Sequence, residues 1–213
     1  MERVEVKGIA ASQMSILDAL LKLRQICCHP RLLKLDMPGF SNNLPSGKFE
    51  AFKELTTTII EDGHKVLVFS QFVQMLHNIR SWLTMNRTPF AYLDGSSKNR
   101  LEEVDNFNNN PDIPVFLISL KAGGTGLNLT SADYVIHYDP WWNPAVESQA
   151  TDRTHRIGQT RQVFAYKMIC ENTVEEKILK LQEMKKGVAE AVIPGQNAWK
   201  GLTRDDLEML FDV

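Results

Sequence analysis

Two arginines, Arg153 and Arg156, are the side chains of this sequence best suited to chemistry on a phosphate. They are three residues apart in a segment predicted to be helical, which follows a predicted strand at residues 134–138. Residues at that spacing lie on one face of a helix, so both guanidinium groups can point at one target. The planar fork of donors on arginine matches phosphate oxygens better than a lysine ammonium does. The alternative is a pair of surface arginines on a solvated helix.

A second phosphate-binding candidate is the glycine-rich segment Lys121-Ala-Gly-Gly-Thr-Gly126. Glycines let a backbone approach a phosphate closely, and successive N–H groups can form an anion-binding nest. Thr125 adds a hydroxyl, and Lys121 adds a positive charge. The alternative is a flexible glycine turn between two strands.

The sequence contains no nucleotide-binding P-loop, which requires a glycine, four residues and then Gly-Lys-Ser/Thr. Gly47-Lys48 is followed by Phe49, and the segment 121–126 lacks the Gly-Lys-Ser/Thr ending. No acidic pair follows a hydrophobic strand as a Walker B site would require. The sequence therefore offers phosphate-directed arginines without the site that would hold a nucleotide.

The spacing of apolar residues predicts alternating helices and strands. Ser15 and Asp18 resemble a capping box that begins the first helix, and Pro30 ends that helix. We expect further helices near residues 49–63, 72–83, 101–107, 173–184 and 203–211, and strands at 65–69, 90–93, 115–119, 134–138 and 163–169. This alternation predicts an α/β fold, a parallel sheet with helices on both faces, with a helical N-terminal lead-in and C-terminal helices.

Polar, glycine-rich or aromatic residues follow four of the predicted strands. Ser70 and Gln71 follow the first, the segment from Asp94 through Gly95 to Ser96 follows the second, residues 121–126 follow the third, and residues 139–143 follow the fourth. Ligands of parallel α/β sheets bind at the carboxyl ends of the strands. We therefore expect the functional residues at one edge of the sheet.

Trp141 and Trp142 are adjacent in a predicted loop between Pro140 and Pro144. Neighbouring side chains cannot both face one core from an extended segment, so we expect at least one ring to be exposed or inserted into a partner. The alternative is that both rings pack beneath the helix that carries the two arginines.

Bulk composition excludes several classes of protein. The 213 residues carry a net charge of −2, which does not indicate a free-standing nucleic-acid-binding protein. The longest apolar stretches are too short to cross a bilayer, and no signal peptide is visible. Three cysteines, two of them adjacent, predict no disulfide framework. Cys27-Cys28-His29 does not have the ligand spacing of a zinc site, so we predict packed, inert thiols and a reducing, intracellular setting.

Several ordered stretches resemble motifs of the Swi/Snf family of helicase-like DNA translocases. The run from Asp139 to Gln159 resembles motif VI, Ser119 to Thr130 resembles motif V, and Val68 to Phe72 resembles motif IV. The segment from Leu20 to Pro30 is similar to the helix by which these ATPases enter their second lobe. The resemblance covers residues 15–187 and implies a RecA-like second lobe.

The resemblance also implies roles for individual residues. Arg153 and Arg156 would be catalytic arginines that reach the γ-phosphate across a cleft, with Gly126, Asn128 and Gln149 on the nucleotide side. Contacts with DNA would come from residues that grip the backbone without reading sequence, namely Ser70, Gln71, Gly95, Ser96, Lys121, Gly123, Gly124, Thr125 and Trp142. No residue is expected to bind a metal.

The implied division is a helical lead-in and loop at 1–45, the lobe at 46–170, and a bracing helix and tail at 171–213. The implied partners are double-stranded DNA and a first ATPase lobe that holds ATP and Mg²⁺. We expect a monomer that does not engage a membrane. We also expect the isolated lobe to be inactive and to bind no cofactor tightly. The implied location is cytoplasmic and nucleoid-associated in a prokaryote, or nuclear in a eukaryote. The alternatives are the second lobe of another helicase-like enzyme, or a non-catalytic regulatory or assembly module. A Walker A lysine and a Walker B acidic pair upstream in the parent gene would favour the enzyme.

Overall fold

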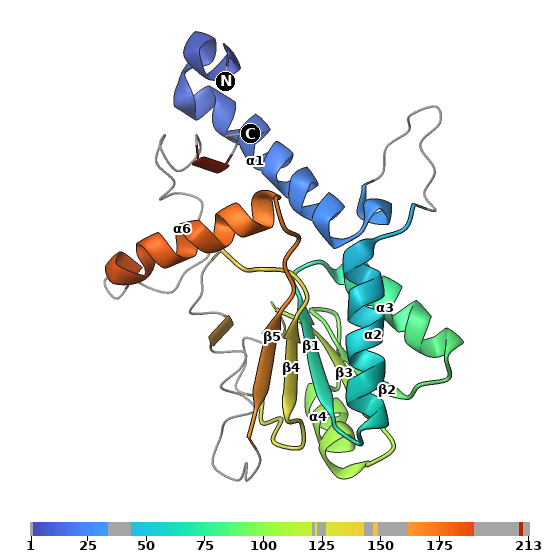
Figure 1. Ribbon diagram of the computed structural model, residues 1–213. Helices are drawn as coiled ribbons and strands as arrows, with labels where there is room; N and C mark the ends of the chain where they lie inside the picture. The colour runs from blue at the N-terminus through green and yellow to red at the C-terminus, as the bar shows by residue number, and fades with distance from the viewer. Residues whose placement is uncertain are drawn as a thin grey trace.

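The computed structural model describes residues 2–33, 44–120, 122, 127–142, 147–148, 162–189 and 209–210. Five strands form one parallel sheet in the order β2-β3-β1-β4-β5. The strands are β1 (Val66–Ser70), β2 (Phe90–Leu93), β3 (Val115–Ser119), β4 (Tyr134–His137) and β5 (Phe164–Lys167). Central β1 pairs with β3 and β4, with Val66 in register with both Val115 and Tyr134. The predicted parallel α/β sheet is thus confirmed (Figure 1).

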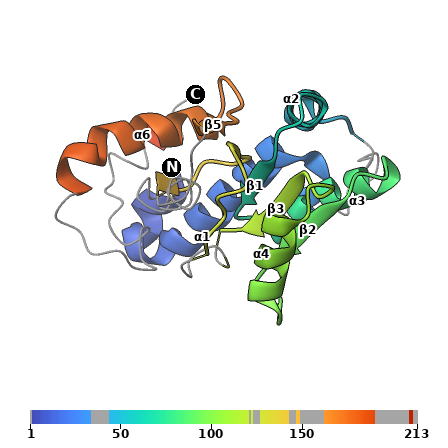
Figure 2. The same ribbon diagram turned by 90° about the horizontal axis from the view of Figure 1, so that it is seen from below.

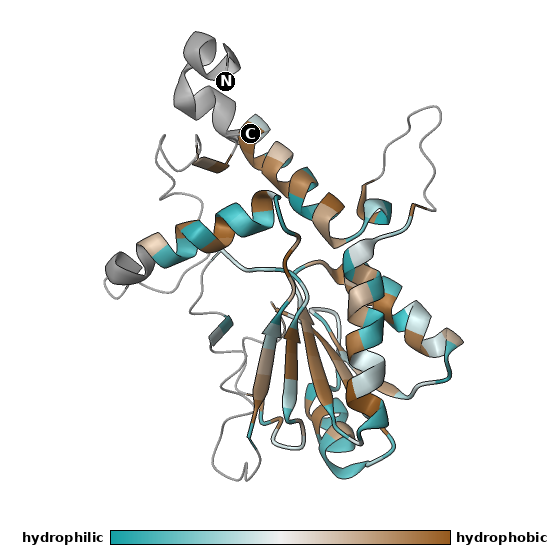
Figure 3. Cartoon of the chain, viewed as in Figure 1, coloured by the Kyte–Doolittle hydropathy of each residue, from teal (hydrophilic) through white to brown (hydrophobic). Residues whose placement is uncertain are grey.

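Helices cover both faces of the sheet, and the alternating side chains of β1 fix which helix packs where. Val66 and Val68 face one hydrophobic cluster with α2 (Gly47–Glu61) and α3 (Val73–Met85). Leu67 and Phe69 face a second cluster, which includes residues of α4 (Arg100–Asn109) and of the segment after β3. All five residues of β1 are buried, as a strand covered on both faces requires. Figure 3 shows the strands as predominantly hydrophobic, and Figure 2 shows α2 and α4 on opposite sides of the sheet.

A third hydrophobic cluster lies outside the sheet, between α1 (Glu2–Cys28) and α6 (Val174–Ala189). Leu20 of α1 is fully buried there, against Val174, Ile178 and Leu181 of α6. The two helices are neighbours beyond the carboxyl ends of the strands (Figure 1). They therefore cover the carboxyl edge of the sheet, at which the functional residues are expected.

Helix boundaries match the prediction except at the N-terminus. Ser46 caps α2 by accepting a hydrogen bond from the Phe49 N–H, and Gly63 takes a φ of +78° just beyond the helix end, as a helix-ending glycine commonly does. The predicted start of the first helix at a Ser15 cap is wrong, because α1 already runs from Glu2 through that position. After Pro30 the chain makes a short 3-10 helix, Pro30–Leu32. Of the predicted helix at 203–211, only residues 209–210 are described.

Within the described part of the chain, no helix is both long enough and apolar enough to span a membrane.

Candidate functional site

A buried carboxylate, Asp139, is at the centre of the carboxyl edge of the sheet. It follows β4 and is 1% exposed. Ser70, the last residue of the neighbouring strand β1, donates a hydrogen bond from its hydroxyl to Asp139 Oδ1 at 2.5 Å. The backbone N–H of Gln71 lies 3.4 Å from Oδ2. Because β1 and β4 are paired in parallel, their ends meet, and Asp139 joins them.

Arg24 reaches this carboxylate from α1 above. It is 1% exposed, its Nη2 is 3.8 Å from Asp139 Oδ2, and it donates a hydrogen bond to the carbonyl of Pro140 at 2.5 Å. Burial lowers the pKa of Arg24, although nearby Asp139 acts against that shift. Burial also raises the pKa of Asp139 to about 6, against the opposing effects of Arg24 and Ser70. The pair thus fixes α1 to the end of β4 at the cost of desolvating two charges.

The two adjacent tryptophans separate into different hydrophobic clusters. Trp141 packs against the cluster on the α4 face of the sheet. Trp142 packs against the cluster between α1 and α6, and the guanidinium carbon of Arg24 is 5.3 Å from its ring centroid. Both residues are half-buried, and the insertion of one ring into a partner stays a prediction. The extended segment sends successive side chains in opposite directions, and the fold supplies a cluster on each side.

The backbone around Trp141 is held by charged and polar side chains from three directions. Its N–H donates to Glu147 Oε1 at 2.6 Å, and Gln182 of α6 donates to its carbonyl. Glu147, itself 1% exposed, also pairs with Lys167 at the end of β5. With the Arg24 bond to Pro140, the segment 140–142 is clamped to α1, α6 and β5. With Glu147, it precedes residues 149–161, which carry the two predicted catalytic arginines.

A second buried ion pair ties α2 to the start of α6. Lys48 forms a salt bridge with Glu175, whose side chain is fully buried, and also donates to the carbonyls of Tyr138 and Met168 at 3.2 and 3.0 Å. Glu175 Oε2 accepts the N–H of Cys170 at 3.0 Å. The ammonium of Lys48, which follows Gly47, is therefore committed to structural contacts.

The turn after β2 is organised by Asp94. Asp94 Oδ1 accepts hydrogen bonds from the Ser96 N–H at 2.8 Å and from the Ser96 hydroxyl at 2.6 Å. The Ser96 hydroxyl is the main cause of a lowered pKa at Asp94, so the turn holds a carboxylate. Gly95 and Ser96 are exposed at the tip, and nothing lies within 4 Å of where a Gly95 side chain would begin. The tip is thus free to approach a partner's backbone.

Comparisons with known proteins agree on one family. The helicase conserved C-terminal domain family matches residues 47–158, which is more than half of the chain. This chain belongs to that family. The C-terminal domain of the Sulfolobus solfataricus SWI2/SNF2 ATPase is 36% identical over 98% of this chain and 85% of that one, with a TM-score of 0.71, which places the chain in the Swi/Snf branch. A putative ATP-dependent helicase/translocase of Bacillus subtilis, YwqA, is 42% identical over 93% of the chain. The human chromatin-remodeling ATPase INO80 is 46% identical over 71% of it.

Solved structures of Swi/Snf ATPases have the same fold as this chain. The Sulfolobus solfataricus SWI2/SNF2 ATPase core in complex with double-stranded DNA is 38% identical, with a TM-score of 0.74 over 98% of this chain and 44% of that one. The fold is therefore RecA-like, as the resemblance implied. The chain spans only 22% of the length of YwqA and 10% of the length of INO80.

Within this Swi/Snf lobe, the described candidate residues divide into three groups. Gln71, Gly95 and Ser96 lie in the turns after β1 and β2, at the carboxyl edge. Ser70 and Trp142 also lie there, but the hydroxyl of Ser70 is buried against Asp139 and the ring of Trp142 packs beneath α1 and α6. Direct DNA contacts by these two side chains stay predictions, and the contacts described give both a structural role.

Asn128 is placed apart from the others. Its side chain is exposed, and its carbonyl accepts a hydrogen bond from Asn108, in the last turn of α4, at 2.9 Å. The carbonyl of neighbouring Phe107 accepts from Lys65, which directly precedes β1. Asn128 thus lies toward the amino edge of the sheet, away from Ser70 and Asp139. Its role beside a nucleotide stays a prediction.

The remaining candidates lie outside the described residues, and their placement is untested. They are Arg153, Arg156, Gln149, Gly126, Lys121, Gly123, Gly124 and Thr125. The structure does describe the anchoring on both sides of residues 123–126. Ala122 donates its N–H to the Ser119 hydroxyl at the end of β3, and Leu127 and Leu129 are buried in the α4-side core.

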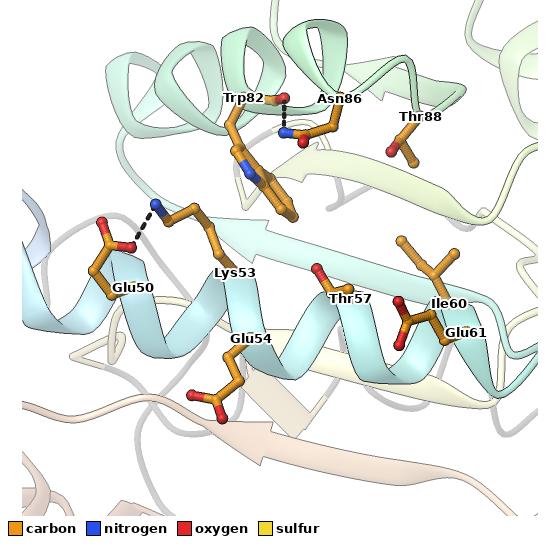
Figure 4. A pocket seen from close by; sticks show the side chains of 9 residues that line it. All are labelled: Glu50, Lys53, Glu54, Thr57, Ile60, Glu61, Trp82, Asn86 and Thr88. Atoms are coloured by element: carbon orange, nitrogen blue, oxygen red, sulfur yellow. Dashed lines mark hydrogen bonds and ion pairs between the residues drawn. The ribbon is translucent and has the colours of Figure 1, made fainter.

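A groove of about 600 Å³ runs between α2 and α3, separate from the carboxyl edge (Figure 4). Trp82 forms one wall, and Glu54 and Glu61 are on the other. Lys53 is paired with Glu50 at 2.5 Å. None of the candidate residues above lines this groove.

Sequence reasoning missed the buried residues that hold the site, above all Arg24, Lys48 and Glu175. A signal was present for Arg24, since it is four residues from both Leu20 and Cys28 and so shares the apolar face of a helix. A charged side chain on such a face needs a buried partner. The sequence does not reveal that this partner is Asp139.

Proposed function

We propose that this chain is the second ATPase lobe of a DNA-dependent ATPase that translocates on double-stranded DNA and remodels protein–DNA complexes. A first lobe elsewhere in the parent protein holds ATP and Mg²⁺. This lobe closes over the nucleotide, contributes Arg153 and Arg156, and contacts the DNA backbone. The observation that best supports the proposal is the clamp on residues 140–142, which fixes the approach to the arginine segment from α1, α6 and β5.

The clamp matters because arginines stabilise a phosphoryl transition state only from a fixed position. An arginine finger contributes about 10³ to 10⁵ in rate, and most of that benefit comes from positioning before the reaction. Arg24 and Gln182 hold the backbone carbonyls of Pro140 and Trp141, so a shift of α1 or α6 moves the segment that leads to the arginines. In the proposal, movement of α1 and α6 during lobe closure therefore changes the position of the arginines relative to the nucleotide.

The described carboxylates at this edge do not fit a magnesium site. Asp139 is fully buried and already receives Ser70, the Gln71 N–H and Arg24. Asp94 is turned into its own loop by Ser96. In this proposal Mg²⁺ is held with ATP on the first lobe, and the contribution of this lobe is charge from arginine.

DNA contact in this proposal uses oriented dipoles rather than massed positive charge. The turn after β2 exposes Gly95 and Ser96 at its tip, and Gln71 lies in the turn after β1. Lys121, Gly123, Gly124 and Thr125 supply the second loop. Such groups hold phosphates without reading sequence. Titrating the isolated chain with duplex DNA at several salt concentrations tests this: we expect weak, sequence-independent binding with a shallow salt slope, because few phosphates are neutralised. Tight binding at physiological salt would contradict it.

The two-lobe arrangement has its own test. The purified 213-residue chain should not hydrolyse ATP above background, with or without duplex DNA, whereas the parent protein should show DNA-stimulated turnover. DNA-stimulated hydrolysis by this chain alone would overturn the proposal. A parent protein without hydrolysis would favour a regulatory module.

A further inference from the structure

Two cysteines far apart in the sequence meet where α1 approaches the start of α6. Cys27 is in the last turn of α1, and Cys170 lies between β5 and α6. Their sulfur atoms lie within 4.8 Å of each other, and the Cys170 thiol donates to the carbonyl of Cys27 at 3.3 Å. Both side chains are half-buried, whereas neighbouring Cys28 is fully buried. The thiols that meet are thus the ones a small molecule in solution can reach.

We propose that Cys27 and Cys170 form a reactive dithiol, a modification site that a peroxide converts to a reversible disulfide between α1 and the segment before α6. Cys27 is the attacking sulfur. Its sulfur lies within 4.8 Å of the Cys170 sulfur, so the second thiol is already in place when Cys27 is oxidised.

The chemistry around Cys27 favours its thiolate. The neighbouring Cys170 side chain lowers the pKa of Cys27 to about 7, and the Thr173 side chain acts in the same direction. The pKa of Cys170 is correspondingly raised, so this thiol keeps its proton. Burial raises the pKa of Cys28 and keeps that thiol inert. Because the thiolate is the nucleophile, Cys27 reacts first.

The reaction balances with hydrogen peroxide as oxidant. The Cys27 thiolate attacks one peroxide oxygen, the O–O bond breaks, and the departing hydroxide takes a proton to become water. Cys27 is then a sulfenic acid. Cys170 attacks the Cys27 sulfur, the S–S bond forms and the S–O bond breaks, and the Cys170 proton leaves with the hydroxide as a second water. Two thiols are oxidised, both peroxide oxygens are reduced, and an added thiol reverses the disulfide by exchange.

A metal ion fits this cluster less well, although Glu175 lies within the same 4.8 Å. Glu175 is already paired with the Lys48 ammonium, and its Oε2 also accepts the Cys170 N–H. A divalent cation would approach that ammonium, and the three side chains leave a tetrahedral zinc site one ligand short. The thiol pair alone explains the arrangement.

The test is oxidation of the reduced 213-residue chain with one equivalent of hydrogen peroxide, followed by intact-mass measurement and peptide mapping. We expect a monomer that loses two hydrogen masses and regains them with dithiothreitol. Trypsin leaves Cys27 and Cys28 in one peptide, so Cys28→Ala identifies the bond: this control should still form the crosslink to the peptide containing Cys170. Cys27→Ser and Cys170→Ser should each abolish it.

A second measurement does not depend on any variant folding. The midpoint temperature of thermal unfolding (Tm) should be about 10 °C higher for the oxidised wild-type chain than for the reduced chain, because the crosslink restricts the unfolded state. A bond between Cys27 and Cys28, oxidation of Cys27 to sulfinic acid without a crosslink, or stoichiometric Zn²⁺ binding that protects both thiols would overturn the proposal. None of these results bears on ATP hydrolysis, so the proposed function is tested separately.

Discussion

The guanidinium of Arg24 and the carboxylate of Asp139 face each other in the interior, 3.8 Å apart, with both side chains at most 2% exposed. They join the lead-in helix α1 to the end of β4, the strand beside central β1. Neither charge has water to solvate it, so each depends on the other and on the neighbouring polar groups, Ser70 and the Pro140 carbonyl.

Removing one partner should therefore be costly. Arg24→Met keeps the length of the side chain but leaves Asp139 as a buried charge, and we expect a loss of about 3 to 5 kcal/mol in the free energy of unfolding. Urea denaturation measures it. Lys22→Met is the matched control, since Lys22 pairs with Asp18 at the surface and should change stability by about 0 to 1 kcal/mol. Equal losses from the two variants would contradict the buried pair.

The pair of Lys48 and Glu175 should behave in the same way from the other side of the site. Lys48→Met leaves the fully buried Glu175 unpaired, so we expect a loss of about 3 to 5 kcal/mol, with Glu175→Gln in the same chain restoring part of it. Lys53→Met, which removes a partly exposed pair with Glu50, is the control. Absence of rescue by the second substitution would argue against a specific Lys48–Glu175 interaction.

Asp139 should also shape the dependence of stability on pH. Its pKa is about 6 in the folded chain and about 3.9 when unfolded, so between those values the folded state binds the extra proton. This contribution to stability is full below about pH 4 and is lost as pH rises through 6. Asp139→Asn removes it. The stability of the wild type relative to the variant should fall by up to about 1.4 kcal/mol per pH unit across that range. A pH-independent difference would contradict the raised pKa.

His137 should contribute with the opposite sign. Burial lowers its pKa to about 4, against about 6.5 in the unfolded chain, so the unfolded state binds the extra proton between those values. Its stabilising effect is full above about pH 6.5 and is lost as pH falls through 4. His137→Gln should therefore flatten the loss of stability on acidification, whereas Asp139→Asn should steepen it. Denaturation curves from pH 4 to 7 for both variants check this, and shifts in the same direction would refute it.

The sheet could be predicted well from the sequence, because the signals for strands and helix ends lie within short segments of the chain. The apolar run at residues 66–69 identifies a strand buried on both faces, and Gly63 and Pro30 mark helix ends. The start of α1 was misplaced because a serine that resembles a cap can also occur inside a helix.

The interior of the site could not be predicted, because its contacts join distant residues. The position of Ser70 follows from the end of β1, but its inward turn depends on Asp139, which follows a strand that is its neighbour only in the folded sheet. The opposite directions of Trp141 and Trp142 follow from alternation, but the cluster that receives Trp142 needs α1 and α6 to meet. Pairings of this kind are set by topology.

In the proposed function, Arg153 and Arg156 act on the phosphoryl transition state. The decisive experiment determines kcat and DNA affinity together for the parent two-lobe protein carrying Arg153→Ala or Arg156→Ala. The control is Arg80→Ala, which removes an exposed arginine of α3. We expect kcat to fall by about 10³ or more for either arginine variant while DNA affinity stays within a few-fold, because an arginine finger stabilises charge that develops only during the reaction. Lysine should rescue poorly, since it lacks the planar fork. Near-normal kcat in both variants, or a loss mainly of DNA binding, would contradict this role.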